Sequence, residues 1–351
     1  MEANRTSEDA GREARAVGPT PVYHGGDLAQ ARARHPQAPT PWIDLSTGIN
    51  PCPYPLPPLP PQAWTRLPEA AEVAALERVA AEAFDVHDPA LIAATPGTQA
   101  LIQMLPRLLA GPRVAILGFT YQEHARVWRE AGREVAIVDD LAACAAADVA
   151  VVVNPNNPDG RLVPAGDLAA LALRMQEHGG RLIVDEAFVD VLEGEVALAP
   201  RLPLGRAVVL RSFGKTWGLA GLRLGFAIGD ADFAEALRRA FGPWAVSGPA
   251  IAVAKAALAD RDWLATERRR LAAAASRLDA LLLAAGLAVI GGTPLYRLAV
   301  GDHAATLLDR LGAAGIHVRR FPHDSRLLRF GLPGTACEWD RLAAALAPTA
   351  E

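Results

Sequence analysis

The chain has 351 residues, of which 51% are hydrophobic, and a formal net charge of −4 at pH 7, which is enough for a large domain with a smaller one. Arginines are interspersed with carboxylates and form no basic stripe, so the composition excludes a typical nucleic-acid-binding protein. Three widely separated cysteines, Cys52, Cys144 and Cys337, predict neither disulfides nor a metal site and favour a cytoplasmic location.

The N-terminal region divides into two segments. Residues 1–20 carry mixed charges and few apolar side chains, which is typical of a disordered tail and not of a signal peptide. Residues 21–65 contain a proline-dense stretch, 51–61, that is too stiff for a helix or a central strand. We expect 21–65 to form an arm that lies across the protein surface. No apolar run in the sequence is long enough to span a membrane.

From residue 66 onwards, short apolar runs alternate with helical patterns. Helices are predicted over 72–84, from about 97 to 109, over 123–131 and over 165–177. Strands are predicted over 91–94, 114–117, 135–138, 149–153, 182–185, 207–211 and 224–228. Those from 114–117 onwards are continuous apolar runs, which are typical of parallel strands buried on both faces. The pattern predicts an α/β large domain, 66–248, with an open, mostly parallel sheet flanked by helices.

The C-terminal part of the chain has a different pattern. Residues 249–286 predict one long, alanine-rich connecting helix with a kink near Asp260. Strands follow over 288–290, 295–300, 316–319 and 327–330, with helices over 304–314 and 338–346. Residues 287–351 are therefore predicted to form a small α+β domain.

Lys215 is the most informative residue of the chain. It follows the predicted strand 207–211 in a glycine-rich stretch, and it and Lys255 are the only lysines in a sequence that otherwise uses arginine. Arginine can replace lysine as a surface charge but not as a nucleophilic amine, because the guanidinium group stays protonated. Lys215 is therefore predicted to form a Schiff base with an aldehyde cofactor.

Further side chains that suit pyridoxal 5'-phosphate lie at the ends of neighbouring strands. Asn157, Asp185 and Lys215 follow three predicted parallel strands, whose carboxyl ends share one edge of the sheet. A buried carboxylate would keep the pyridine nitrogen protonated, and an amide would face the phenolate oxygen. Tyr121 is predicted to stack on the ring. The residues predicted to bind the phosphate, at a helix N-terminus with polar side chains beside it, are Gly97, Thr98, Gln99, Ser212 and Arg223. Taken singly, each residue also fits an ordinary turn, a helix cap or a half-buried position.

Four motifs together carry a family resemblance. They are Asn157-Pro-Asp-Gly160, Asp185-Glu-Ala-Phe188, Ser212-Phe-Gly-Lys215 and Gly221-Leu-Arg-Leu-Gly225. In this order they resemble the fold-type I pyridoxal-phosphate aminotransferase superfamily, and the chain is about the size of its histidinol-phosphate aminotransferases and its threonine-phosphate decarboxylases of cobalamin biosynthesis.

Three features are similar to the decarboxylases. They are the arm segments 23–27 and 44–51, Phe188 where aminotransferases usually carry a tyrosine, and the segment 243–247. Two positions depart from the relatives. Leu67 lies in a segment where relatives have a tyrosine that reaches the neighbouring subunit's cofactor, and Gly48 stands where relatives can have asparagine.

The resemblance implies a homodimeric carboxy-lyase that uses pyridoxal phosphate and no metal. Its reaction would convert L-threonine O-3-phosphate to (R)-1-amino-2-propanol O-2-phosphate and carbon dioxide, with Lys215 and Asp185 as catalytic residues. The residues implied to bind the substrate are His24, Gly25, Asn157, Arg319 and Arg329. An aminotransferase acting on histidinol phosphate is the alternative. A non-catalytic cofactor-binding protein would need a damaged site, whereas the key lysine, aspartate and asparagine are all present.

Overall fold

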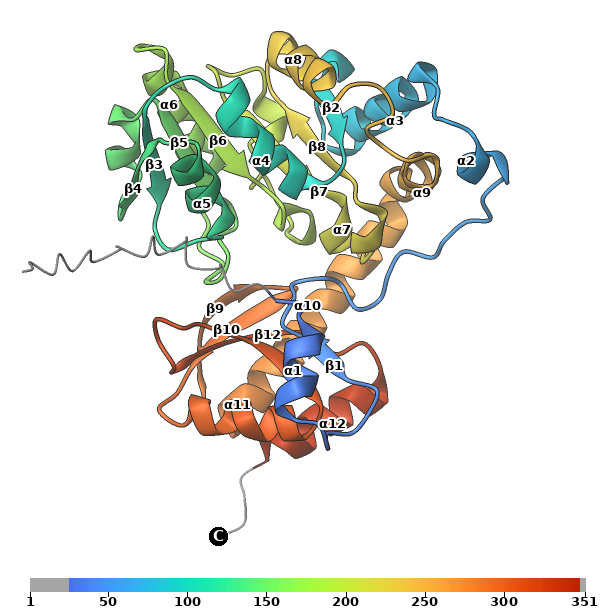
Figure 1. Ribbon diagram of the computed structural model, residues 1–351, viewed down its shortest axis with the longest axis vertical. Helices are drawn as coiled ribbons and strands as arrows, with labels where there is room; N and C mark the ends of the chain where they lie inside the picture. The colour runs from blue at the N-terminus through green and yellow to red at the C-terminus, as the bar shows by residue number, and fades with distance from the viewer. Residues whose placement is uncertain (1–24, 348–351) are drawn as a thin grey trace, which may run out of the picture.

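The computed structural model describes residues 25–347 and contains a large and a small domain, each built on its own sheet (Figure 1). The large sheet has seven strands in the order β2-β8-β7-β6-β5-β3-β4. Their bounds are β2 Ile92–Thr95, β3 Arg113–Leu117, β4 Glu134–Val138, β5 Val149–Val153, β6 Arg181–Asp185, β7 Val208–Ser212 and β8 Gly225–Ile228. The predicted α/β class with a mostly parallel sheet is confirmed, because β4, β3, β5, β6 and β7 all pair in parallel.

One strand runs against the prediction. The strand predicted over 224–228 as parallel is β8, which is antiparallel to both of its neighbours, β7 and β2. Between β7 and β8 the chain makes only α7, Phe213–Thr216, and a 3-10 turn, Ala220–Leu222. This return contains no long helix to carry the chain back across a sheet face, which parallel pairing usually requires.

Helices cover the large sheet on both faces. They are α3 Ala70–Ala83, α4 Thr98–Leu108, α5 Glu123–Glu130, α6 Ala165–Gln176, α8 Ala231–Phe241 and α9 Gly248–Ala259. The sheet separates two apolar clusters: Val184 and Val209 pack on one face, whereas Ile183 and Leu210 pack on the other. The central strands are thus buried on both sides, as their continuous apolar runs predict.

The long connecting helix is in fact two helices. The prediction of one helix over 249–286 is wrong, because α9 ends at Ala259 and α10 spans Arg261–Ala284. Asp260 leaves the helical conformation, with φ −86° and ψ 77°, and its carboxylate accepts a hydrogen bond from the Trp263 amide at 3.0 Å. An aspartate that caps a helix N-terminus in this way restarts the helix instead of bending it.

The small domain takes its first strand from the N-terminal arm. Its five-stranded sheet has the order β1-β11-β12-β10-β9, and β1 pairs in parallel with β11. The small-domain elements are α1 Leu28–Arg34, β1 Ile43–Leu45, β9 Ala288–Thr293, β10 Tyr296–Val300, α11 Ala304–Ala313, β11 Ile316–Arg320, β12 Leu327–Gly331 and α12 Ala336–Leu346. The short helix α2, Gln62–Thr65, packs against α9 of the large domain. The expectation of a surface arm over 21–65 is therefore wrong around β1, since Ile43 and Leu45 are buried in the small-domain core. The predicted tail, 1–20, lies outside the described residues.

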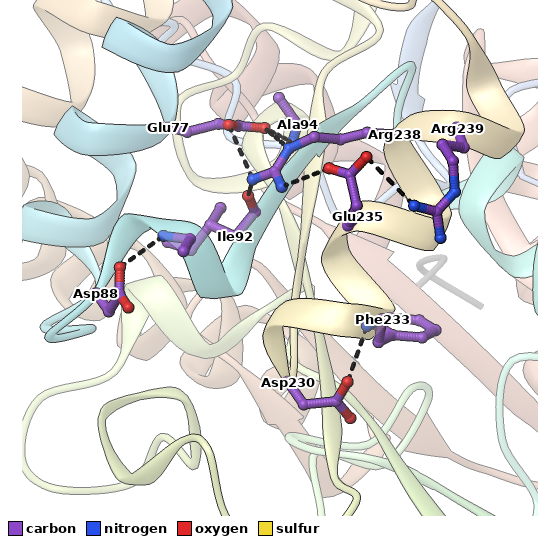
Figure 2. A network of polar contacts seen from close by, with 10 residues as sticks. Glu77, Asp88, Ile92, Ala94, Asp230, Phe233, Glu235, Arg238 and Arg239 are labelled. Atoms are coloured by element: carbon purple, nitrogen blue, oxygen red, sulfur yellow. Dashed lines mark hydrogen bonds and ion pairs between the residues drawn. The ribbon is translucent and has the colours of Figure 1, made fainter.

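A partly buried ion pair holds α3, α8 and β2 together (Figure 2). The buried Glu77 carboxylate accepts a hydrogen bond from the Ala94 amide at 3.0 Å and pairs with Arg238 at 3.1 Å. Arg238 also donates to the Ile92 carbonyl oxygen. Figure 2 shows that the neighbouring Arg239 points toward Glu235 instead, at the protein surface.

Replacing Arg238 by alanine is expected to lower the free energy of unfolding by about 1–3 kcal/mol, because the buried Glu77 carboxylate loses its cationic partner. Arg239→Ala removes the same charge from a surface pair and is expected to cost less than about 1 kcal/mol. Urea unfolding of both variants measures the difference. Equal losses would show that the Glu77–Arg238 pair contributes nothing beyond surface charge.

Candidate active site

A cavity of about 320 Å³ lies where the parallel strands of the large sheet end. Every residue that the sequence predicts to bind the cofactor lines it: Gly97, Thr98, Gln99, Tyr121, Asn157, Asp185, Ser212, Lys215 and Arg223. These residues come from segments that are far apart in the chain. The sheet brings them together because the carboxyl ends of its strands meet at one edge.

Lys215 lies on the short helix α7, directly after β7. Burial of its amine, together with the positive charge of Arg329, lowers its pKa to about 8, although the Asp185 carboxylate acts in the opposite direction. The tight turn around it depends on Gly214, where a Cβ atom would come within 2.7 Å of the Ala220 Cα. Near neutral pH a larger fraction of this amine is uncharged than of an ordinary lysine amine, so it is suited to attack an aldehyde.

Asp185, the last residue of β6, is buried and held from two sides. One carboxylate oxygen lies 2.9 Å from Nε2 of His124 on α5, and the other accepts the Ala187 amide at 3.1 Å. His124 is fully buried, and its Nδ1 has no hydrogen-bond partner among residues 25–347. This residue could not be predicted from the sequence, because a lone histidine in a helical pattern carries no signal of its own. It fixes the orientation in which Asp185 faces the cavity.

An anion cradle occupies one end of the cavity. Helix α4 begins at Thr98, after Gly97 with φ +88°, so its first amide groups have no partner within the helix. A Cβ atom on Gly97 would meet Nη2 of Arg223 at 3.0 Å, and one on Gly225 would meet the Thr98 nitrogen at 2.8 Å. Glycine at both positions therefore allows the helix N-terminus and the Arg223 guanidinium group to converge. With the Ser212 hydroxyl, this geometry fits a phosphate group.

A chain of hydrogen bonds holds Tyr121 in the cavity wall. Its hydroxyl donates to Gln99 at 2.9 Å, and the Gln99 amide donates to the buried Glu123 carboxylate at 2.6 Å. Burial, followed by the charge of Glu123, raises the pKa of the Tyr121 phenol well above its usual value. The phenol therefore stays neutral and keeps donating, which fixes the ring as one wall of the cavity.

The small domain contributes Arg329, on β12, to the same site. Its guanidinium group donates to Oδ1 of Asn157 and, at 2.6 Å, to the carbonyl oxygen of Ser46. The bond to Asn157 leaves the Nδ2 group of that amide as a donor for an oxygen in the cavity. Burial, together with the like charge of Arg319, lowers the pKa of Arg329 to about 10. Arg319 lies directly opposite Arg329 in the β11–β12 pairing, so the two side chains share one face of the sheet.

Of the two substrate-binding residues predicted in the arm, the structure describes one. Gly25 packs against Ser46 so closely that a Cβ atom would come within 2.4 Å of the Ser46 carbonyl oxygen, the atom that Arg329 also contacts. His24 lies outside the described residues.

Phe188 and Tyr296 form an aromatic wall behind the lysine. Their ring centroids lie 5.0 Å apart, and Nζ of Lys215 lies 5.6 Å from the Phe188 centroid. The Tyr296 hydroxyl donates to the Asn156 carbonyl oxygen at 2.6 Å. A Cβ atom on Gly48 would approach both rings to 2.9 Å, so the aromatic wall leaves room for glycine at this position and for no larger residue. Tyr296 is the second site residue that the sequence does not reveal, because its buried apolar strand resembles any core strand.

The arrangement defines a class of protein. The family model for class I and II aminotransferases matches residues 62–346. The chain belongs to this family, whose members are pyridoxal-phosphate enzymes, and the resemblance inferred from the four motifs is confirmed.

Particular relatives are more informative. A threonine-phosphate decarboxylase of Pseudomonas aeruginosa is 43% identical, over 93% of this chain and 97% of that protein. One from Sinorhizobium sp. is 45% identical, over 93% of this chain and 98% of its own length. Among solved structures, histidinol-phosphate aminotransferase from Sinorhizobium meliloti in complex with pyridoxal 5'-phosphate superposes with a TM-score of 0.77, covering 96% of both chains. At 23% identity this last match shows a shared fold and no more.

Proposed function

We propose that this enzyme decarboxylates L-threonine O-3-phosphate to (R)-1-amino-2-propanol O-2-phosphate and carbon dioxide, with pyridoxal 5'-phosphate as cofactor, in cobalamin biosynthesis. Two relatives that are 43% and 45% identical over nearly the whole chain carry the name of this activity. The cavity residues fit the cofactor, because they offer an amine, a buried carboxylate and a cradle for a phosphate.

The cofactor supplies, when bound, a sink for the electrons of the bond that breaks at the substrate Cα. The chain does the rest. Lys215 would hold the aldehyde carbon of the cofactor and, once the substrate amine has taken its place there, would be positioned to return a proton to Cα. Asp185, oriented by His124, holds a proton on the ring nitrogen, because an ionised carboxylate stabilises the protonated form. The α4 N-terminus, Ser212 and Arg223 hold the phosphate.

The observation that supports a phosphorylated amino acid most is the pairing of Arg319 with Arg329. Two guanidinium groups directly opposite each other on neighbouring strands repel one another. A substrate with a carboxylate and a phosphate brings negative charge to this face and offsets the repulsion, and arginine binds either group in a bidentate manner. The substrate is thereby oriented by its anionic groups, which determines the bond that breaks.

Incubation of the holoenzyme with threonine phosphate is expected to release carbon dioxide and the amino-propanol phosphate in equal amounts with no keto acid added. Lys215→Ala holoenzyme serves as the blank. If turnover instead requires 2-oxoglutarate and yields glutamate, the protein is an aminotransferase and this proposal is wrong.

Exposed apolar side chains support a homodimer. Trp64 on α2, Leu67 and Trp244 are 68%, 63% and 58% exposed. They belong to one region, because Ala63 of α2 packs against Gly248 at the start of α9. Large exposed apolar side chains that cluster in this way mark protein interfaces. Within residues 25–347 the three cysteines are unpaired, and no helix there is long and apolar enough to cross a bilayer.

The double change Trp64→Glu with Trp244→Glu is expected to shift the protein from dimer to monomer by at least about tenfold in dissociation constant, because charges would have to be buried at the interface. Light scattering after size exclusion gives the mass. Leu173→Glu, at an exposed leucine of α6, is the control and should remain dimeric. A wild-type mass of one chain would contradict the assignment.

A further inference from the structure

Residues 50–54 of the N-terminal arm lie against the short helix that carries Lys215, on the path of the arm from β1 to α2 (Figure 1). We call them the strap. Helix α7 ends at Thr216, and the last carbonyl oxygens of a helix have no partner within it. Main-chain amides of the strap supply two donors there. The Asn50 amide donates to the Lys215 carbonyl oxygen at 3.0 Å, and the Tyr54 amide donates to that of Trp217 at 2.9 Å.

The side chain of Asn50 adds a third bond to this helix end and ties it to α10. Asn50 is buried, and its Nδ2 group donates to the Thr216 carbonyl oxygen at 2.8 Å and to the buried Glu267 carboxylate at 2.7 Å. Its Oδ1 atom accepts from the Cys52 amide at 2.9 Å and from Arg270 at 2.8 Å. These four bonds use both donors and both lone pairs of the amide, so no other side chain can replace all of them.

Close packing on two sides limits how far α7 can shift. A Cβ atom on Gly218, directly after the helix, would come within 2.7 Å of both the Asn50 carbonyl oxygen and the Pro53 Cα. On the other side, a Cβ atom on Gly214 would come equally close to the Ala220 Cα. The strap thus packs directly on the backbone of the lysine loop. A displacement of about 1 Å at a reacting group can cost about 100-fold in rate, so this contact can matter for catalysis.

We propose that Asn50 is a positioning residue, which holds the backbone of α7 so that the Lys215 amine stands at its working place in the active-site cavity. The proposal rests on the proposed role of Lys215. Asn50 does not line that cavity, so it acts through the lysine and not on the substrate. Its partners Glu267 and Arg270 belong to α10, which packs into the small-domain core. The same side chain therefore ties the lysine to the domain that contributes Arg329.

The test compares Asn50→Ala and Arg270→Gln with wild type. Arg269→Gln is the matched control, because Arg269 is the exposed neighbour of Arg270 on α10 and bonds to Thr266 instead, at 3.3 Å. Each apoprotein is mixed with pyridoxal 5'-phosphate, and the fraction fixed to Lys215 is followed over time by borohydride reduction and mass spectrometry. Steady-state kinetics of the holoenzymes with threonine phosphate then separates kcat from KM.

Asn50→Ala is expected to fix the cofactor at least about tenfold more slowly and to lower kcat by about 10–100-fold, while KM changes less than about threefold. Arg270→Gln should show the same split between kcat and KM at smaller size. Because the Arg270 side chain is only partly buried, this variant is expected to fold. Arg269→Gln should match wild type in both measurements.

Wild-type rates in Asn50→Ala would overturn the proposal. Equal losses in Arg238→Ala would also overturn it, because that variant loses an ion pair between α3 and α8, and reduced stability alone would then account for the effect. If thermal unfolding shows that Asn50→Ala does not fold, Arg270→Gln decides, and wild-type rates there would overturn the proposal. Wild type that fixes no cofactor at Lys215 would instead overturn the proposed function, and with it this role of Asn50.

Discussion

Lys215→Ala is expected to lower kcat by at least about 10⁴-fold, because in the proposed mechanism this one side chain both holds the cofactor and moves the proton at Cα. The same variant should contain no cofactor that borohydride can fix to the protein. Its buried amine has a pKa of about 8 in the unliganded protein, so it is available as a nucleophile where an ordinary lysine is not.

Lys255→Ala is the matched control, since it removes the only other lysine, which is exposed on α9. It should retain wild-type activity and wild-type covalent trapping, measured by mass spectrometry of the reduced protein. Covalent cofactor in the Lys215→Ala protein would mean that another amine carries the aldehyde, and the assignment of Lys215 would then be lost.

Arg329→Gln is expected to lower kcat/KM by about 10²–10³-fold, because hydrogen bonds to a charged group each contribute about 1.5–3 kcal/mol. The guanidinium group also donates hydrogen bonds to Asn157 and to the Ser46 carbonyl oxygen, and both would be lost. The Arg329→Lys variant should not recover the lost kcat/KM, because a lysine amine cannot form the two parallel hydrogen bonds that a planar guanidinium group forms with an anion. Arg320→Gln is the control: Arg320 follows Arg319 on β11 and faces the other side of the sheet, so kcat/KM should change less than about threefold.

The Arg319→Gln variant tests which arginine binds the phosphate of the substrate and which binds the carboxylate. If Arg319 binds the phosphate, this variant loses its preference for threonine phosphate over threonine. The Arg329→Gln variant should instead have a lower kcat/KM with both substrates. Steady-state kinetics with the two substrates gives the ratio. An unchanged preference in Arg319→Gln would exclude Arg319 from the phosphate contact.

The sequence predicts the residues that line the active-site cavity, but not the residues that hold them in position. Lys215, Asp185 and Asn157 could be found because each places a functional group at the end of an apolar strand, where it has no use in a core. His124 and Tyr296 could not, because both lie in segments whose burial is explained without them. Their roles appear only when the Asp185 carboxylate and the Asn156 carbonyl oxygen are seen beside them.

The errors in the fold have a common physical cause. An apolar run shows that a strand is buried but not which way it runs, so β8 was assigned the wrong direction. The short β1 is stabilised by pairing with β11, which lies far away in the chain, and local patterns do not report such pairing. The break between α9 and α10 depends on one aspartate cap, which an alanine-rich helix pattern conceals.

The central claim is that the enzyme breaks the bond from Cα to the carboxylate and leaves the Cα–H bond intact. It is tested most directly with threonine phosphate that carries deuterium at Cα, followed by mass spectrometry and proton NMR of the amine product. The account predicts that all of the deuterium remains on C1 of the amino-propanol phosphate, next to one proton from solvent delivered by Lys215. Loss of the deuterium to water, with formation of a keto acid, would show that Cα–H is the bond that breaks and would contradict the account.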